Sequence, residues 1–361
     1  MRVARIGVVF VMGIVAGLLV SGCRSCVDSA PAPTVAGPET PAVLAPLDGH
    51  LLFTVTGGAL MDVELPAKAE KMIRLGEKQP VHAVAGPDGS GRIVIVVDEA
   101  PGHALKVLPL SGGPEKVVFA RPGGTLWDHA TGASIALARE GGNVALLEKT
   151  AGYQIAPEAY VEPGCLEVWN LDRGTGGPLG TDACLSVADR GLSFSTDGGT
   201  LAYVAYDPRE TTATLPNSTG ESVTAWATWK KLPVVHLYEF ANKRDTAFAV
   251  GERPVLAEDG ASVLLQDSHG SPVRIDRASK VVTHLGLPGE TGFGVVAAVG
   301  DAILYQGFAT AGAPRKTRPM SMGGTEDLHT VKVTRAGTNQ FATIAEGVGI
   351  WSSVSFGRLK R

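Results

Sequence analysis

The sequence predicts an all-β protein built from repeated units of four antiparallel strands. Three observations support this fold class: turn signals of the Asp-Gly type recur along the chain, an alternating apolar strand follows each of them, and almost no segment has helical periodicity. An Asp-Gly pair between apolar runs is a strong hairpin signal, because glycine tolerates the positive φ that tight turns need. The lack of helical spacing argues against an α/β fold.

The turn signals place the first hairpin of each unit. Each signal precedes a short apolar strand, and the pairs are Asp48-Gly49 with 51–55, Asp88-Gly89 with 93–97, Thr131-Gly132 with 135–138, Asp197-Gly198-Gly199 with 201–205, Asp259-Gly260 with 262–265, and Gly300-Asp301 with 303–305. Thr131-Gly132 is a shifted form of this pattern, with threonine in place of aspartate. Together the signals predict about six units, the number expected from one hairpin signal per unit.

A second hairpin of similar kind follows the first. Examples are 104–110 with 116–119, 235–240 with 246–250, 273–276 with 280–285, and 330–334 with 341–345. Two hairpins make a four-stranded sheet, and a unit of about 40 residues has the length of a propeller blade. We therefore expect a six-bladed β-propeller of four-stranded antiparallel blades. A seventh blade around residues 165–187 and an open β-sandwich are the alternatives.

The end of the chain is expected to close the ring of blades. Residues 351–356 have the pattern of the strand that the opening unit lacks, because the Asp48-Gly49 turn lies at the very start of that unit. Pairing this last strand with the first blade would leave only short, protected sheet edges.

One unit resembles a known repeat. Residues 191–204 read Gly-Leu-Ser-Phe-Ser-Thr-Asp-Gly-Gly-Thr-Leu-Ala-Tyr-Val, which is similar to the repeat of TolB-type and WD40-like (PD40) propellers. Only this unit matches well; the others keep the turn and the second strand. The resemblance implies the propeller fold and a protein that works by contact rather than catalysis. Many unrelated functions share propellers, so the fold alone assigns none of them.

The first residues have the features of an export signal. Arg2 and Arg5 give a positively charged n-region, and residues 6–20 form an apolar, uncharged h-region. The small residues Ser21 and Gly22 then precede Cys23, as expected of a cleavage site. These features predict a signal peptide over residues 1–22. The apolar run is shorter than the roughly 20 residues that a membrane-spanning helix needs. An uncleaved helix and ordinary cleavage, with Cys23 as a bystander, are the alternatives.

The cleavage region also resembles the lipobox of bacterial lipoproteins. Residues 19–23 read Leu-Val-Ser-Gly-Cys, and the resemblance implies that a diacylglycerol on Cys23 anchors the protein to a membrane. Arg24 stands where an aspartate would favour the inner membrane, so the resemblance implies the outer membrane. A Pro- and Ala-rich linker over residues 23–47 then leads to the propeller over residues 48–361.

Composition and cysteines restrict the remaining possibilities. Apolar residues make up 44% and charged residues 19% of the chain, with a formal net charge of −4. This is the composition of a folded body, and no basic stripe favours nucleic acid. Cys165 and Cys184 are expected to form a disulfide worth about 3 kcal/mol, with two free thiols as the alternative. Cys26 has no assigned role, and no zinc site or other cofactor is expected.

A binding surface is expected on the face opposite the Asp-Gly turns. The long segments 149–164, 207–232 and 307–327 should all lie there, and long loops in a compact domain are often functional. Candidate contacts to a protein partner are two tryptophans and a small cationic patch that would suit an acidic partner: Trp226, Trp229, Arg315, Lys316 and Arg318. The alternatives are tryptophans that hold down their own loop and an ordinary solvated loop.

The sequence contains no recognisable catalytic motif for a serine hydrolase, a phosphate-binding loop or a zinc protease. His82, Asp128 and His129 are expected on inner strands, where a histidine and a carboxylate could support acid–base chemistry; structural histidines are the alternative. Our leading hypothesis is a cell-envelope lipoprotein whose propeller is a protein-binding or scaffold module without catalytic activity. The alternative is an enzyme, or a glycan- or peptide-binding protein, with its site in the central channel.

Overall fold

The computed structural model describes residues 41–55, 58–75, 81–99, 102–122, 135–149, 153–156, 159–161, 163–179, 187–207, 232–267, 270–287, 294–308, 317–319, 325–348 and 353–360. All of them lie in one compact unit of the chain, Val35–Arg361. The proposed signal peptide, Cys23 and Cys26 lie outside the described residues. Among the described helices, none is long and apolar enough to span a membrane.

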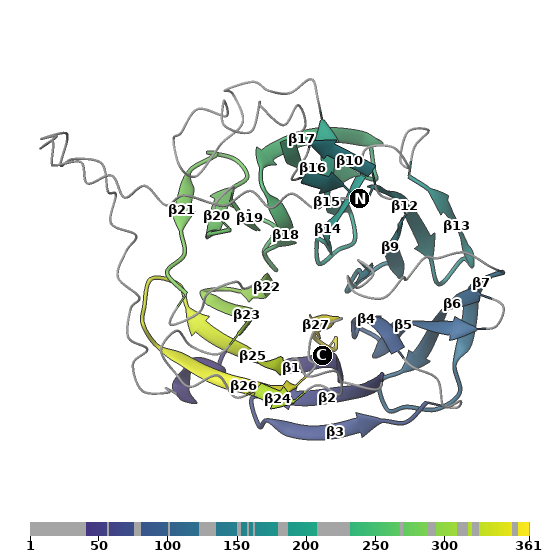
Figure 1. Ribbon diagram of the computed structural model, residues 1–361, viewed down its shortest axis with the longest axis horizontal. Coiled ribbons are helices and arrows are strands. Elements are labelled where there is room, and N and C mark those ends of the chain that lie inside the picture. The colour runs from purple at the N-terminus through teal and green to yellow at the C-terminus, as the bar shows by residue number, and fades with distance from the viewer. Residues whose placement is uncertain are drawn as a thin grey trace, which may run out of the picture. The chain divides into compact units, whose positions relative to one another are not determined.

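The described strands form a ring of six four-stranded antiparallel blades, so the predicted fold class is confirmed (Figure 1). The first three blades, each written from the innermost strand outward, are β27 (Val354–Gly357), β1 (Gly49–Val55), β2 (Ala59–Leu65) and β3 (Ala69–Ile73); β4 (Val81–Ala85), β5 (Arg92–Glu99), β6 (Gly102–Pro109) and β7 (Lys116–Pro122); and β8 (Ile135–Leu137), β9 (Asn143–Lys149), β12 (Pro163–Asn170) and β13 (Thr175–Pro178).

The second half of the ring repeats the same order. Its blades are β14 (Val187–Phe194), β15 (Thr200–Asp207), β16 (Leu232–Glu239) and β17 (Arg244–Val250); β18 (Glu252–Leu256), β19 (Ser262–Gln266), β20 (Pro272–Asp276) and β21 (Val282–His284); and β22 (Gly294–Val299), β23 (Ala302–Phe308), β25 (Thr325–Arg335) and β26 (Phe341–Val348). The alternative seventh blade is wrong, because the segment proposed for it contributes β12 and β13 to blade 3 and then begins β14.

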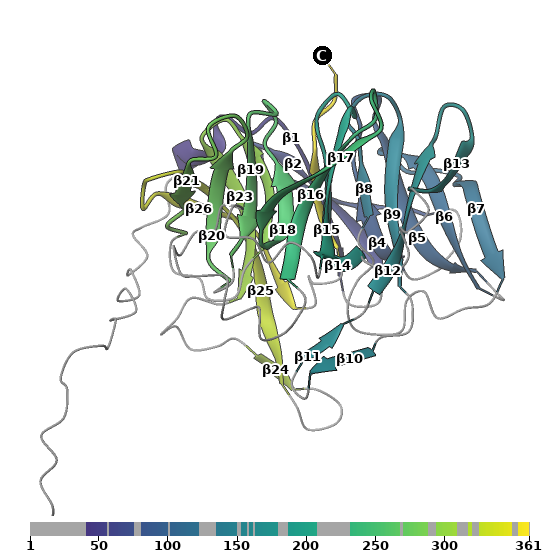
Figure 2. The same ribbon diagram turned by 90° about the horizontal axis from the view of Figure 1, so that it is seen from above.

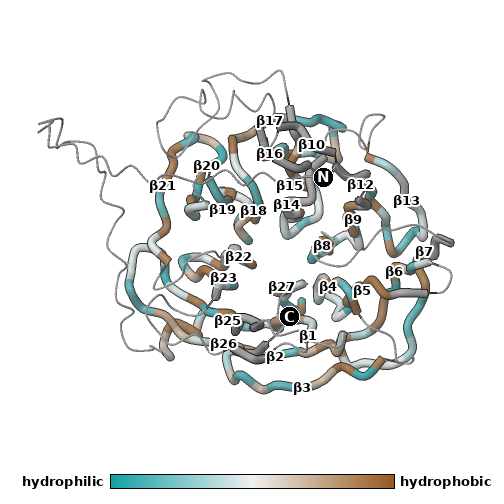
Figure 3. Tube along the Cα trace, viewed as in Figure 1, coloured by the Kyte–Doolittle hydropathy of each residue, from teal (hydrophilic) through white to brown (hydrophobic). Residues whose placement is uncertain are grey.

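The core consists of six hydrophobic clusters, one between each pair of neighbouring blades. Strand β5 shows why the second strand of a blade is continuously apolar. Ile93 and Ile95 pack against blade 1, whereas Val94 and Val96, on the other face of the strand, pack against blade 3. Both faces of such a strand are buried, so it needs no polar alternation. Figure 3 shows the contrast with the outermost strand β3, which has a hydrophilic stretch.

The C-terminal strand closes the ring, as the sequence predicts. β27 pairs with β1 in antiparallel register, with Val354 opposite Phe53 and Gly357 opposite His50. A short 3-10 helix, η1 (Pro41–Leu44), precedes β1. Its residues Val43 and Leu44 are buried in the cluster between blades 1 and 6, although the sequence places them in the linker.

The connections are sorted onto two faces of the ring (Figure 2). We call the face with the Asp-Gly turns the hairpin-turn face and the opposite one the long-loop face. The connections from β9 to β12, from β15 to β16 and from β23 to β25 each join the second to the third strand of a blade, so all three belong to the long-loop face, as predicted. Two of them carry short strands: β10 (Tyr153–Ala156), β11 (Ala159–Val161) and β24 (Thr317–Pro319).

The first turn of blade 3 differs from the prediction. Thr131-Gly132 was expected to precede the second strand, but residues Ile135–Leu137 form the innermost strand β8 instead. The turn into the second strand is Glu140-Gly141-Gly142, with φ of 77° at Gly141 and 65° at Gly142. Two successive glycines supply the positive φ that this tight turn requires.

Candidate functional site

A cavity of about 180 Å³ lies between the innermost strands of the ring. The residues that line it include Leu192, Phe194, Val296 and Phe356, but the surface that the wall exposes is more polar than apolar. These side chains come from β14, β22 and β27, which are first strands of three different blades. Ligand sites are usually concave cavities of this kind, so the channel is the first candidate.

An ionic cluster lines the same cavity at the hairpin-turn face. Arg139, Glu258 and Arg358 each lie directly beyond the end of a first strand, in blades 3, 5 and 1. Nη1 of Arg139 is 2.5 Å from Oε1 of Glu258, and Nη1 of Arg358 is 2.7 Å and 2.8 Å from its two carboxylate oxygens. The three side chains are each 26% exposed. One carboxylate therefore lies between two guanidinium groups.

The C-terminal residues lie next to this cluster. The backbone N–H of Lys360 donates to the carbonyl of Gly89 at 2.7 Å, and Gly89 N–H in turn donates to the carbonyl of Arg139 at 2.7 Å. Nη2 of Arg139 donates to the carbonyl of Leu359 at 3.4 Å, and Nζ of Lys360 is 3.6 Å from Oε1 of Glu140. The tail thereby connects the first turns of blades 2 and 3 beside the mouth of the channel.

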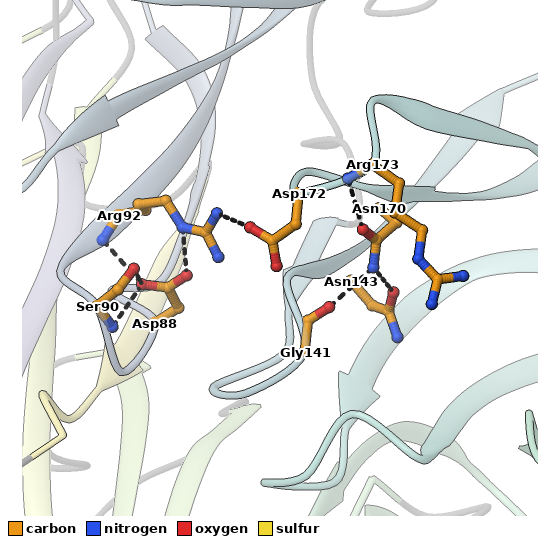
Figure 4. A network of polar contacts seen from close by, with 8 residues as sticks. All are labelled: Asp88, Ser90, Arg92, Gly141, Asn143, Asn170, Asp172 and Arg173. Carbon is orange, nitrogen blue, oxygen red and sulfur yellow. Dashed lines mark hydrogen bonds and ion pairs between the residues drawn. The ribbon is translucent and has the colours of Figure 1, made fainter.

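A second polar network on this face joins blades 2 and 3 (Figure 4). Asp88 caps its own turn by accepting hydrogen bonds from the backbone of Ser90 and Arg92, both at 2.9 Å, and from Nε of Arg92 at 2.7 Å. The guanidinium of Arg92 also pairs with Asp172 of blade 3. Burial opposes the charge of Arg92, but its pKa is raised because hydrogen bonds to Asp172 and Asp88 outweigh that burial. This network is an inter-blade connection outside the cavity wall.

Blade 4 contains a histidine–aspartate pair away from the cavity, in which His236 is buried and Asp245 is exposed. Nδ1 of His236 is 3.0 Å from Oδ2 of Asp245, and the hydroxyl of Tyr203 donates to the same oxygen at 3.0 Å. Burial, and then the charge of Asp245, raise the pKa of Tyr203. The ring of Tyr203 packs in the cluster between blades 3 and 4, so we assign this group a structural role.

Most of the residues chosen from the sequence lie outside the described residues. These are Cys23, Asp128, His129, Cys184, Trp226, Trp229, Arg315 and Lys316. Arg318 lies in β24 and Cys165 in β12, where only the backbone is described. His82 lies on β4, a first strand as expected, and is partly buried, but it is not one of the residues that line the cavity.

Sequence reasoning missed Arg139, Glu258 and Arg358. Their shared signal is positional: each falls one or two residues beyond the end of a first strand, next to a turn or the chain end. Within the described ranges, no group of three or more His, Cys, Asp or Glu residues is placed to hold a metal ion. The charged groups that line the cavity are the guanidinium groups of Arg139 and Arg358 and the carboxylate of Glu258.

Comparison with known proteins supports the fold. No protein-family model matches the chain, and no curated protein matches it. A chain of the nidogen/laminin complex matches with a TM-score of 0.54 and 10% identity, over 86% of this chain and 99% of that one. A structure described as TolB from Agrobacterium tumefaciens matches with a TM-score of 0.51 and 10% identity, over 85% of this chain and 92% of that one. The chain is thus a six-bladed propeller of TolB-like fold.

Proposed function

We propose that this chain is a cell-envelope lipoprotein whose propeller binds a protein partner through the long-loop face. One observation carries the proposal: the three long connections between second and third strands all belong to one face of the ring. Long connections add surface without disturbing the blades, because the strands that they join are held by the inter-blade cores. Such connections can therefore form a contact surface while the blades stay intact.

Two of these connections contain regular structure of their own. In the first, β10 pairs with β11, with Tyr153 opposite Val161. In the connection from β23 to β25, β24 pairs with an extension of β25, with Thr317 opposite Asp327. Figure 2 shows both pairs beyond the ends of the blade strands on the long-loop face.

The residues proposed to touch the partner come from the sequence. Trp226 and Trp229 lie in the connection from β15 to β16, and Arg315, Lys316 and Arg318 in the connection from β23 to β25. Tryptophan and arginine are the residue types enriched at interface hot spots. A lipid on Cys23, followed by the Pro-rich linker, would tether the propeller to the outer membrane and leave this face available to another envelope protein.

The contact proposal is tested by photo-crosslinking in intact cells. A photoreactive amino acid at position 229 is compared with one at position 339, an exposed residue of the β25–β26 turn on the hairpin-turn face. We expect a recurrent protein adduct from position 229 and none from position 339. Equal adducts from both positions, or none from position 229 in a folded and labelled protein, would contradict the proposal.

Anchoring is tested separately. Mass spectrometry of the mature N-terminal peptide should find a diacylglycerol on Cys23 in the wild type, and Cys23→Ser should release the protein from the membrane fraction. An unmodified cysteine, or an intact signal segment, would contradict the anchoring proposal while leaving the contact face untouched.

A further inference from the structure

We propose that the channel cavity is a binding site for a small monocarboxylate that carries hydroxyl groups. Its carboxylate binds the guanidinium groups of Arg139 and Arg358 beside Glu258, and its hydroxyl groups bond to the polar wall of the channel. The proposal goes beyond the protein-binding function, since the cavity lies between the innermost strands whereas the long connections belong to one face of the ring.

The first argument is charge. Among the described residues that line the cavity, Arg139 and Arg358 carry two positive charges and Glu258 balances one of them. Lys360 and Glu140, beside the mouth of the channel, pair with each other and leave this balance unchanged. The two guanidinium groups are partly shielded from water, so the remaining positive charge interacts more strongly than it would in bulk solvent. A ligand with one negative charge would complete the balance.

The second argument is the supply of hydrogen-bond donors. A guanidinium group has five N–H donors. Within the described part of the chain, Arg358 uses Nη1 for Glu258 and Nε for the carbonyl of Asp48 at 2.9 Å, whereas its Nη2 donates to nothing. Arg139 uses Nη1 and Nη2, and its Nε donates to nothing. The planar carboxylate is a group whose geometry guanidinium donors match.

The third argument is the polarity of the wall. The side chains of Leu192 and Phe194 pack in the core between blades 3 and 4, and those of Val296 and Phe356 pack in the core between blades 6 and 1. The cores thus take up these apolar groups, and the surface that the cavity exposes is more polar than apolar. A ligand that keeps hydrogen-bonding groups along its length suits such a wall better than an apolar one.

The innermost strands supply polar groups to this wall. β18 and β22 lie at the inner ends of their blades (Figure 1), and in the described part of the chain each pairs along one edge only, with β19 and β23. The N–H and C=O groups along the other edge of such a strand have no ladder partner. Ser193 adds a hydroxyl that accepts from the N–H of Leu256 at 3.0 Å and, among the described residues, donates to nothing.

The size of the cavity limits the ligand. A volume of about 180 Å³ would hold about six water molecules at about 30 Å³ each. That space suits a hydroxy acid as small as glycerate, with its carboxylate at the arginines and its hydroxyl groups on the strand edges.

Ligand-observed NMR on the purified full-length protein tests this ligand class. The probes are glycerate, its amide glyceramide, and butanoate, which has a carboxylate on an apolar body. We expect glycerate to bind about tenfold more tightly than glyceramide, because the amide lacks the charge, and more tightly than butanoate, because that body cannot bond to the wall. No binding of glycerate, or equal binding of either comparison probe, overturns the proposal.

One variant and its control assign the binding to this cavity. Arg139→Gln should weaken glycerate binding about tenfold, the usual cost of one charge-assisted hydrogen bond. Arg335→Gln is the matched control, because Arg335 pairs with Asp301 and does not line the cavity. It should bind like the wild type. Equal binding by the two variants would overturn the proposal.

A second variant predicts a shift that the loss of folded protein cannot imitate. Glu258→Gln removes the carboxylate that competes with the ligand for the guanidinium groups of Arg139 and Arg358. Glycerate should then bind about fivefold more tightly, the effect of one charge at close range in a solvated site. Unchanged or weaker binding by this variant, with a circular dichroism spectrum like that of the wild type, would overturn the proposal.

Discussion

Ser355 and Gly86 exchange two hydrogen bonds across the closure of the ring. The N–H of Gly86 donates to Oγ of Ser355 at 3.0 Å, and that hydroxyl donates to the carbonyl of Gly86 at 3.1 Å. Ser353 repeats the arrangement with Val84, at 2.9 Å and 2.8 Å. β27 is therefore joined to β1 by backbone pairing and to β4 of blade 2 by two serine side chains, so one short strand links both neighbours.

The closure predicts a strong effect of Gly357→Ala. A Cβ at this position would lie 2.0 Å from the carbonyl oxygen of Pro87, so β27 or the first turn of blade 2 would have to move. We expect the free energy of unfolding to fall by about 2 kcal/mol, the usual cost of forcing an extra group into a packed site. Thermal unfolding followed by circular dichroism measures the change.

The matched control for closure is Gly177→Ala. Gly177 lies on the outermost strand β13, where an added Cβ meets no atom of the described residues within 4 Å. We expect this variant to change the free energy of unfolding by less than about 0.5 kcal/mol. An equal loss in both glycine variants would show that the contact with Pro87 is not the cause.

Glu258→Gln tests the ionic cluster as a connection between blades. The substitution leaves the guanidinium groups of Arg139 and Arg358 without the carboxylate that joins them. We expect a loss of about 1 kcal/mol in the free energy of unfolding, measured by urea titration. Adding Arg139→Gln to this variant should cost less than it does in the wild type, because the two residues are coupled. Strictly additive losses would contradict that coupling.

The blades were predictable because their signals are local. A turn such as Asp197-Gly198 needs a particular residue type at each position, and the second strand that follows it is apolar because neighbouring blades cover both of its faces. Blade 3 shows the limit of this reasoning. Glu140-Gly141-Gly142 lacks the Asp-Gly pair that marks the other first turns, although two glycines with positive φ meet the same backbone requirement.

The ionic cluster was not predictable in the same way. Arg139, Glu258 and Arg358 are separated by 119 and 100 positions along the chain. They meet only because the six blades form a closed ring around one channel, so no local pattern marks them. Conversely, His82 was placed correctly on a first strand, but which side chains line the channel depends on the register and twist of each strand, which periodicity alone leaves open.

The pH dependence of stability should include a contribution from Asp197. Its pKa is lowered because the hydroxyl of Ser195 donates to it at 2.5 Å and the N–H of Gly199 donates at 2.9 Å. A carboxylate with a lowered folded pKa stabilises the protein above its unfolded pKa of about 3.9, and that stabilisation is lost as the pH falls through the folded value. Ser195→Ala removes the main donor.

We therefore expect the urea midpoint of the Ser195→Ala variant to fall less steeply below about pH 4 than that of the wild type. The same variant should be less stable than the wild type at pH 7, where Asp197 is ionised in both. Parallel pH profiles for the two proteins would contradict the assignment of this acid sensitivity to Asp197.

The predicted disulfide has a direct chemical test. If Cys165 and Cys184 are joined, alkylation of the unfolded, unreduced protein should leave both unlabelled, and a non-reducing peptide map should contain the linked pair. Reduction should lower the free energy of unfolding by about 3 kcal/mol, because the loop between the two residues is then free in the unfolded chain. Labelling of both thiols without reduction would rule the bond out.

Asp62 is a carboxylate of blade 1 with no exposed surface. Its two oxygens lie 3.0 Å and 3.2 Å from Nδ1 of His50, and Nζ of Lys71 is 3.1 Å away. Asp62→Ala removes the partner of a buried histidine, so we expect a loss of about 3 kcal/mol in a urea titration. Lys71→Met should cost less than about 1 kcal/mol, because the Lys71 side chain is 50% exposed and exposed pairs contribute little. Similar losses from both variants would mean that Lys71, rather than His50, is the partner that stabilises Asp62.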